Sequence, residues 1–133
     1  RTIRRRMSHS PYPAGTMLIP SGPGKHLFIV ITRLCGANQH LLVCVSSIKQ
    51  DVRHDTACVF QGGEHEFIKG PTFVYYRLAE TRRADAITKA VDSGYFAIKA
   101  DLTAPHFENV CQGFETSNFV KPWARNYFIE NRP

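Results

Sequence analysis

Two apolar segments constrain the fold of this 133-residue chain more than any other feature. They are HLFIVITRL, residues 26–34, and HLLVCVSSI, residues 40–48. In an extended first segment, one face carries Leu27, Ile29 and Ile31, and the other carries Phe28, Val30 and Thr32. A strand that is apolar on both faces is covered by protein on both faces. The sequence therefore predicts a sheet in which 26–34 and 40–48 are central strands.

Shorter segments predict the rest of the sheet. We expect strands at 15–20, 56–60, 72–78 and 95–102, with a short one at 65–68 and a glycine-proline turn at 21–25. In TFVYYRL, residues 72–78, alternation places Phe73, Tyr75 and Arg77 on one face and Val74, Tyr76 and Leu78 on the other.

The periodicity becomes helical after these strands. In residues 81–94, apolar Ala84, Ile87 and Val91 recur at helical spacing, with Thr81 as the expected N-cap and Gly94 just beyond the last turn. A second helix is expected at 103–114, with Thr103 as its cap and Pro105 in its first turn. Its apolar stripe consists of Phe107, Val110, Cys111 and Phe114.

This order of elements predicts a mainly β chain with C-terminal helices, an α+β fold built on a small, partly open barrel. We divide it into a basic flexible arm at 1–13, a barrel domain at 14–117 and an aromatic tail at 118–133. The tail is expected to pack on the domain or on a partner. The longest apolar runs of the sequence, LFIVI and LLVCV, are far shorter than the roughly 20 residues of a membrane helix.

Charge, cysteine spacing and short motifs limit the kinds of partner, metal site and enzyme that the sequence supports. Lys and Arg number 17 against 11 Asp and Glu, a net charge of +6 that would assist binding to RNA or DNA. The four cysteines have no CxxC spacing, so we expect no metal site, no cofactor and reduced thiols in a cytoplasm. The chain has no GxSxG, Walker A or HExxH motif, and those enzyme classes have no support.

Two histidines are candidates for proton transfer. His65 lies in GGEHEF between Glu64 and Glu66. His26 begins a central strand beside Lys25. The alternatives are a solvated loop residue for His65 and a strand-end residue bonded to backbone for His26.

Further candidates lie at strand ends. Arg77 could grip a phosphate, and Tyr75 and Tyr76 could stack on a base, although an arginine at a barrel edge can also lie there only as a solvated charge. Ser46 and Ser47 end the strand at 40–48 and could instead bond loop backbone.

Several segments, taken in order, resemble the MazF/PemK family of bacterial toxins. They are PAGTMLIP, PGKHLFIVIT, LLVCVSSI, GPTFVYYRLAETRR and GYFAIKADLTAPHFENVCQGF, which together span roughly residues 14–117. The resemblance implies an SH3-like barrel and a metal-independent endoribonuclease that cuts single-stranded RNA by attack of the 2′-hydroxyl on the adjacent phosphate. It also implies a homodimer, a cognate antitoxin protein and a bacterial or phage-encoded, cytoplasmic chain.

On this resemblance the catalytic candidates are His26, His65, Arg77 and Ser46. The resemblance also implies that His65 lies in a loop near the edge of the groove and is not buried. The candidate RNA-binding residues are Lys25, Ser47, Tyr75, Tyr76 and Arg33.

The sequence also departs from the family pattern. Lys25 and His26 stand where the family has an arginine before a proline, and the carboxylate near Arg77 is absent. Two other hypotheses therefore remain open. One is a non-catalytic nucleic-acid-binding barrel, and the other is a protein-interaction module that uses its aromatic C-terminal tail.

Overall fold

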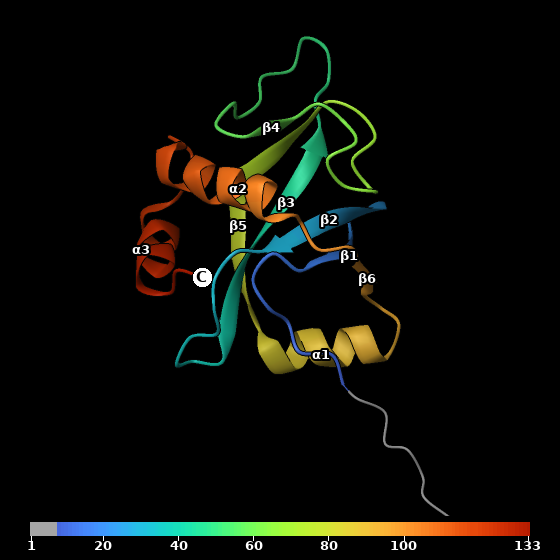
Figure 1. Cartoon of the computed structure of the whole chain (residues 1–133), viewed down its shortest axis with the longest axis vertical. Helices are drawn as coiled ribbons and strands as arrows, with labels where there is room; N and C mark the ends of the chain where they lie inside the picture. The colour runs from blue at the N-terminus through green and yellow to red at the C-terminus, as the bar shows by residue number, and fades with distance from the viewer. Residues whose placement is uncertain (1–7) are drawn as a thin grey trace, which may run out of the picture.

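The computed structural model describes residues 8–133, which form one antiparallel sheet and three helices (Figure 1). The elements are β1 (Thr16–Ser21), β2 (Gly24–Val30), β3 (Gln39–Ser47), β4 (Val59–Phe60), β5 (Thr72–Arg83), α1 (Ala84–Asp92), β6 (Ala97–Lys99), α2 (Ala104–Thr116) and α3 (Pro122–Glu130). The strands are ordered β4-β5-β3-β2-β1-β6 and curl into a half-barrel. β2 and β3 are central, which confirms the prediction from their apolar faces.

The first hairpin follows from its turn residues. Ser21 pairs with Gly24, so Gly22 and Pro23 form a two-residue turn. Gly22 has φ +61°, a conformation that glycine adopts without steric cost, and the proline ring fixes the φ of Pro23. The turn sets the register of β1 on β2 and places Lys25 and His26 at one end of the sheet.

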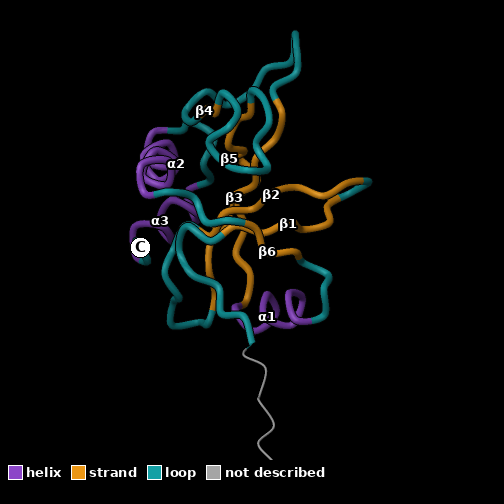
Figure 2. Tube along the Cα trace, turned by 45° about the vertical axis from the view of Figure 1, so that its right-hand side comes forward, coloured by secondary structure: helices purple, strands orange, loops and turns teal. Residues whose placement is uncertain are grey.

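The two faces of the sheet carry separate cores. One face, which we call the α2/α3 face, packs Leu27, Ile29, Val43 and Val74 with residues of α2 and α3. The other, the α1 face, packs Phe28, Val30, Leu42 and Cys44 with Ile87 of α1. Figures 1 and 2 show α2 and α3 on one side of the strands and α1 at the end where β5 finishes. The alternation predicted for residues 26–34 is thereby confirmed for its buried members.

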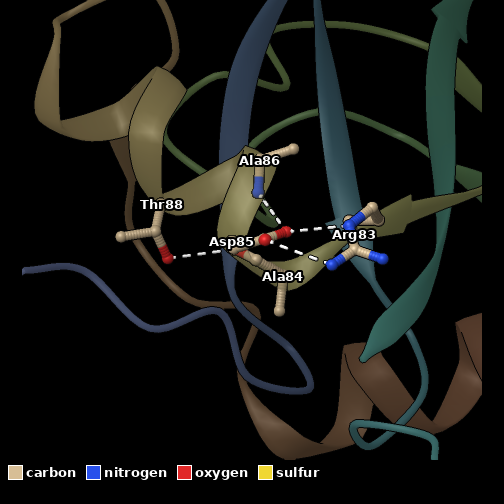
Figure 3. Close-up of polar contacts among 5 residues, drawn as sticks. All are labelled: Arg83, Ala84, Asp85, Ala86 and Thr88. Carbon is tan, nitrogen blue, oxygen red and sulfur yellow. Dashed lines mark hydrogen bonds and ion pairs between the residues drawn. The ribbon is translucent and has the colours of Figure 1, made fainter. Parts of the chain in front are cut away.

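The first helix starts later than predicted. α1 begins at Ala84 with Arg83 as its N-cap residue, so the expectation that Thr81 caps it is wrong. Thr81 instead pairs with Leu41, because β5 continues as a strand as far as Arg83. At the helix start, Arg83 forms an ion pair with Asp85 at 3.1 Å (Figure 3). Asp85 also accepts a hydrogen bond from the backbone N–H of Ala86.

An irregularity divides β5. Cys44 pairs with Tyr75 and Leu42 pairs with Glu80, so residues 76–79 of β5 lie opposite Val43 alone. This bulge breaks the alternation of the strand. Leu78, which we expected on the face of Val74 and Tyr76, is consequently 50% exposed.

The C-terminal helices close the α2/α3 face. Val110 and Phe114 of α2 are buried there, and Phe107 and Cys111 pack beside them, as the predicted stripe requires. Thr103 is the N-cap residue of α2, but its side chain makes no capping hydrogen bond. The aromatic tail forms α3, whose Ala124 and Phe128 belong to the same core.

The N-terminal arm is described only in part. Residues 1–7 of the predicted arm lie outside the described residues, while the segment that follows contacts the domain. The carbonyl of His9 accepts a hydrogen bond from Thr88 of α1, and the hydroxyl of Tyr12 donates one to Asp101. Within residues 8–133, no helix combines the length and apolar character needed to cross a membrane.

Candidate functional site

Four of the predicted site residues gather where β2 begins, β3 ends and β5 begins. Ser47 of β3 pairs with Thr72 of β5, and the start of β2 lies on the other side of β3. Because neighbouring strands are antiparallel, these three termini meet at one end of the sheet. The elements therefore bring Lys25, His26, Ser46 and Ser47 together, whereas Arg77, which we expected to converge with His26 and Ser46 across one groove, lines a different pocket.

A pocket of about 370 Å³ opens at this end, and we call it the lysine pocket. Its lining residues are Lys25, His26, Leu27, Val45, Ser46, Ser47, Lys49, Phe67, Ile68 and Thr72. It is therefore lined by two lysines, a histidine and three hydroxyl residues, and none of these described lining residues is acidic. The hydroxyl of Thr72 already donates to the carbonyl of Gly70, which leaves those of Ser46 and Ser47. Such a set of donors suits an anion, and a phosphate oxygen in particular.

His26 is the third residue of β2, near the end of the sheet where the lysine pocket opens. Phe28 pairs with Cys44, so alternation places His26 and Ser46 with them on the α1 face. Ser46 in turn pairs with Phe73 of β5. The imidazole is partly buried, and its Nδ1 is shielded from solvent with no hydrogen-bond partner among the described residues. A buried polar atom without a partner is uncommon in folded proteins.

A larger groove of about 790 Å³ lies beside β5, and we call it the aromatic groove. Its lining residues are Asp51, Val52, Arg53, His54, Asp55, Phe73, Tyr75, Arg77 and Phe119. Phe73, Tyr75 and Arg77 share one face here, which confirms that part of the alternation predicted for 72–78. Arg77 is exposed and Tyr75 is half-buried.

The sheet side of this groove is a ladder of rings. Phe73 lies between two partners, with its ring centroid 5.3 Å from that of His54 and 5.1 Å from that of Tyr75. These separations are typical of tilted aromatic pairs, which hold one another in place. Since neighbouring strands are about 4.8 Å apart, His26 on β2 and Phe73 on β5 are separated by roughly 10 Å across the sheet.

His65 occupies a different place from the one expected. It is buried, with 5% of its surface exposed, so the prediction of a groove-edge loop histidine is wrong. Nε2 donates to the carbonyl of Ala100 at 2.6 Å and lies 3.1 Å from Oγ1 of Thr16, while Nδ1 accepts from the backbone N–H of Phe67 at 2.9 Å. Both ring nitrogens are thus occupied, and the ring fastens its loop to β1 and to the segment after β6.

The acidic neighbours of His65 serve the same loop. Glu64 accepts hydrogen bonds from the backbone N–H groups of Gln61 and Gly62, both at 2.7 Å. These bonds hold the pKa of the Glu64 carboxyl below its ordinary value. Glu66 accepts a hydrogen bond from the backbone N–H of Ala100. The GGEHEF segment is therefore a polar hairpin tip that is bonded into the fold.

Two predicted RNA-binding residues lie away from both pockets. Tyr76 is fully buried, and its hydroxyl donates to the carbonyl of Val110 at 2.7 Å. Burial raises the pKa of this phenol, and its ring has no surface on which a base could stack. Arg33 is exposed and donates to the carbonyl of Glu130 at the end of α3.

Sequence reasoning missed several of the residues that line the two pockets. Lys49 lines the lysine pocket, and Arg53, His54 and Phe119 line the aromatic groove. The only available signal was the basic character of KQDVRHD, a segment that follows the serine-rich end of β3. Phe119 had no such signal, since it belongs to the predicted tail.

Comparison of the sequence with protein-family models and with curated proteins, and of the fold with solved structures, finds no match. Among residues 8–133, no group of three or more His, Cys, Asp or Glu side chains is arranged to hold a metal ion. The site is consequently interpreted from its own chemistry.

Proposed function

We propose that this protein binds single-stranded RNA at the end of its sheet and cleaves it without a metal ion, as a divergent member of the MazF/PemK type with an SH3-like barrel. One observation carries the proposal. The lysine pocket places an imidazole, three hydroxyls and two lysines around one cavity with no acidic lining side chain, and the aromatic groove opens beside it.

The chemistry of the pocket suits attack by an RNA 2′-hydroxyl on the neighbouring phosphate. His26 accepts the proton of that hydroxyl as the general base of this pocket. Lys25 and Lys49 stabilise the negative charge that grows on the phosphate oxygens. The new bond joins the 2′-oxygen to phosphorus as the bond from phosphorus to the 5′-oxygen breaks. The leaving oxygen takes a proton from solvent, which gives a 2′,3′-cyclic phosphate and a 5′-hydroxyl.

Arg77 takes another role in this scheme. It lines the aromatic groove and not the lysine pocket, so it contacts a phosphate one or more nucleotides away from the scissile one. His65 is left out of the chemistry because both of its ring nitrogens are engaged with the fold.

One observation favours a second function, RNA binding without cleavage. Among the described lining residues of the lysine pocket, His26 is the sole imidazole, and no carboxylate is present to act as its acid or base partner. A homodimer and an antitoxin that occupies the RNA site are further parts of the first proposal, and they rest on the family resemblance alone.

Cleavage of a mixed single-stranded RNA in EDTA tests the two functions. We expect products with 2′,3′-cyclic phosphate ends, a loss of about 100-fold or more in rate for His26→Ala, and little change for Lys89→Gln on α1. Retained RNA binding without any cleavage would replace the first function with the second. If neither cleavage nor binding is found, both are overturned.

A further inference from the structure

The aromatic groove carries a feature that the resemblance does not cover. Phe119 lies in the turn between α2 and α3, beyond residues 14–117, and yet it lines the same groove as Phe73 and Tyr75. Its side chain is 52% exposed. A large apolar ring that faces a groove of this size is a contact surface for a flat apolar ligand.

The backbone of Phe119 is fixed even though its ring is exposed. Its N–H donates to Oγ of Ser117 at 3.1 Å, and that hydroxyl donates to Asp55. Asp55 also accepts the N–H of Ala57, so it joins the loop after β3 to the turn after α2. On the other side, Arg125 donates to the carbonyl of Ser117 at 2.7 Å.

The same contacts engage Asp55, one of the two acidic residues that line the groove. Asp55 is 9% exposed, and two donors within the fold engage its oxygens, so few of its acceptor sites face the groove. The exposed charged residues of the groove are then two cations, Arg53 and Arg77, and one anion, Asp51. The groove thus offers rings for a base and guanidinium groups for the phosphates on either side of it.

We infer that the aromatic groove is a nucleobase subsite for single-stranded RNA, with Phe119 on one wall and the His54–Phe73–Tyr75 ladder on the other. The inference rests on the proposed RNA binding and adds the base-binding subsite to it. The base enters a groove whose walls are already ordered, so little side-chain entropy is lost on binding. The turn between α2 and α3 is then part of the RNA site.

The test uses an eight-nucleotide 2′-O-methyl RNA of mixed sequence, which lacks the attacking hydroxyl, and a matched oligomer with abasic positions. Binding is measured by fluorescence anisotropy for the wild type and for the variants Phe119→Ala, Phe119→Trp and Trp123→Ala. Trp123 is the control, because it is a 46% exposed aromatic residue on α3 that is not among the groove residues.

We expect Phe119→Ala to weaken binding of the base-containing oligomer by about fivefold or more, the loss of one stacked base. Phe119→Trp should retain the affinity, Trp123→Ala should leave it unchanged, and the abasic oligomer should be insensitive to all three substitutions. Circular dichroism confirms that each variant is folded.

Several results would overturn the inference. One is equal binding by Phe119→Ala and Trp123→Ala, and another is an equal loss on the abasic oligomer; either leaves RNA binding in place and removes the base subsite. Failure of the wild type to bind either oligomer removes both proposals. Phe119-dependent binding together with no cleavage of ordinary RNA keeps the subsite and rejects the nuclease.

Discussion

Removal of the two lysines of the lysine pocket should change how RNA affinity responds to salt. Each phosphate neutralised on a single strand adds about 0.7 to the slope of log affinity against log salt concentration. Lys25 and Lys49 both line the pocket, so Lys25→Gln/Lys49→Gln should lower the slope by about 1.4 if each contacts one phosphate. When salt rises fourfold, from 50 to 200 mM, the ratio of the RNA affinity of the wild type to that of the double variant should then fall by about sevenfold.

The matched control removes two positive charges from the other end of the sheet. Ser47 pairs with Thr72 at the site end and Gln39 with Arg83 at the far end, where α1 begins. Arg83→Gln/Lys89→Gln therefore changes the net charge equally but leaves the pocket intact. The assay is anisotropy of a labelled 2′-O-methyl RNA at five salt concentrations. Equal slopes for both double variants would refute the assignment of phosphate contacts to the lysine pocket.

Three further predictions concern the framework that holds the site. Gly113→Ala should lower the free energy of unfolding by about 2 kcal/mol, because the new Cβ overlaps the Tyr76 hydroxyl. This loss should outweigh the better helix propensity of alanine. A higher urea midpoint for the variant would contradict this packing. His65→Ala should lower the free energy of unfolding by about 2–3 kcal/mol, because both ring nitrogens are bonded to the fold. The RNA affinity of the folded variant should stay within about twofold of the wild type. A selective loss of cleavage at unchanged stability would instead show that His65 is catalytic. Burial raises the pKa of Cys44 and of Cys111 to about 11, so the folded state keeps protons that the unfolded state releases near pH 8.5. The stabilisation that these thiols contribute should therefore be complete below about pH 8.5, and the free energy of unfolding should fall as the pH rises toward 11. The fall should be less steep in the double variant Cys44→Ala/Cys111→Ala. The same dependence of the urea midpoint on pH in wild type and variant would contradict this prediction.

The parts of the fold that sequence could predict depend on local patterns. The apolar alternation of 26–34 and 40–48 placed two central strands, and Gly94 ends α1 with φ +83°, as its position after the helical pattern predicts. The end of β5 was beyond such reasoning. Thr81 is a good cap in isolation, but pairing with Leu41 keeps it in the strand.

The candidate site was predictable only where residues lie at strand ends. Lys25, His26, Ser46 and Ser47 meet because antiparallel neighbours bring their termini together, and the hairpin turn and apolar runs carry that information. The position of His65 was not readable, since it depends on contacts with Thr16 and Ala100 far along the chain. Phe119 was missed for the same reason.

The measurement that tests the account most directly is a map of the RNA-binding surface in solution. A ¹⁵N-labelled sample is titrated with the eight-nucleotide 2′-O-methyl RNA, and backbone amide shifts are followed by NMR. The account predicts the largest changes at Lys25, His26, Ser46 and Ser47, with further changes at Tyr75 and along the aromatic groove, and little change in α1. Shifts that cluster on α1 or β6, with the end of the sheet unaffected, would contradict the claim that this end of the half-barrel is the working surface.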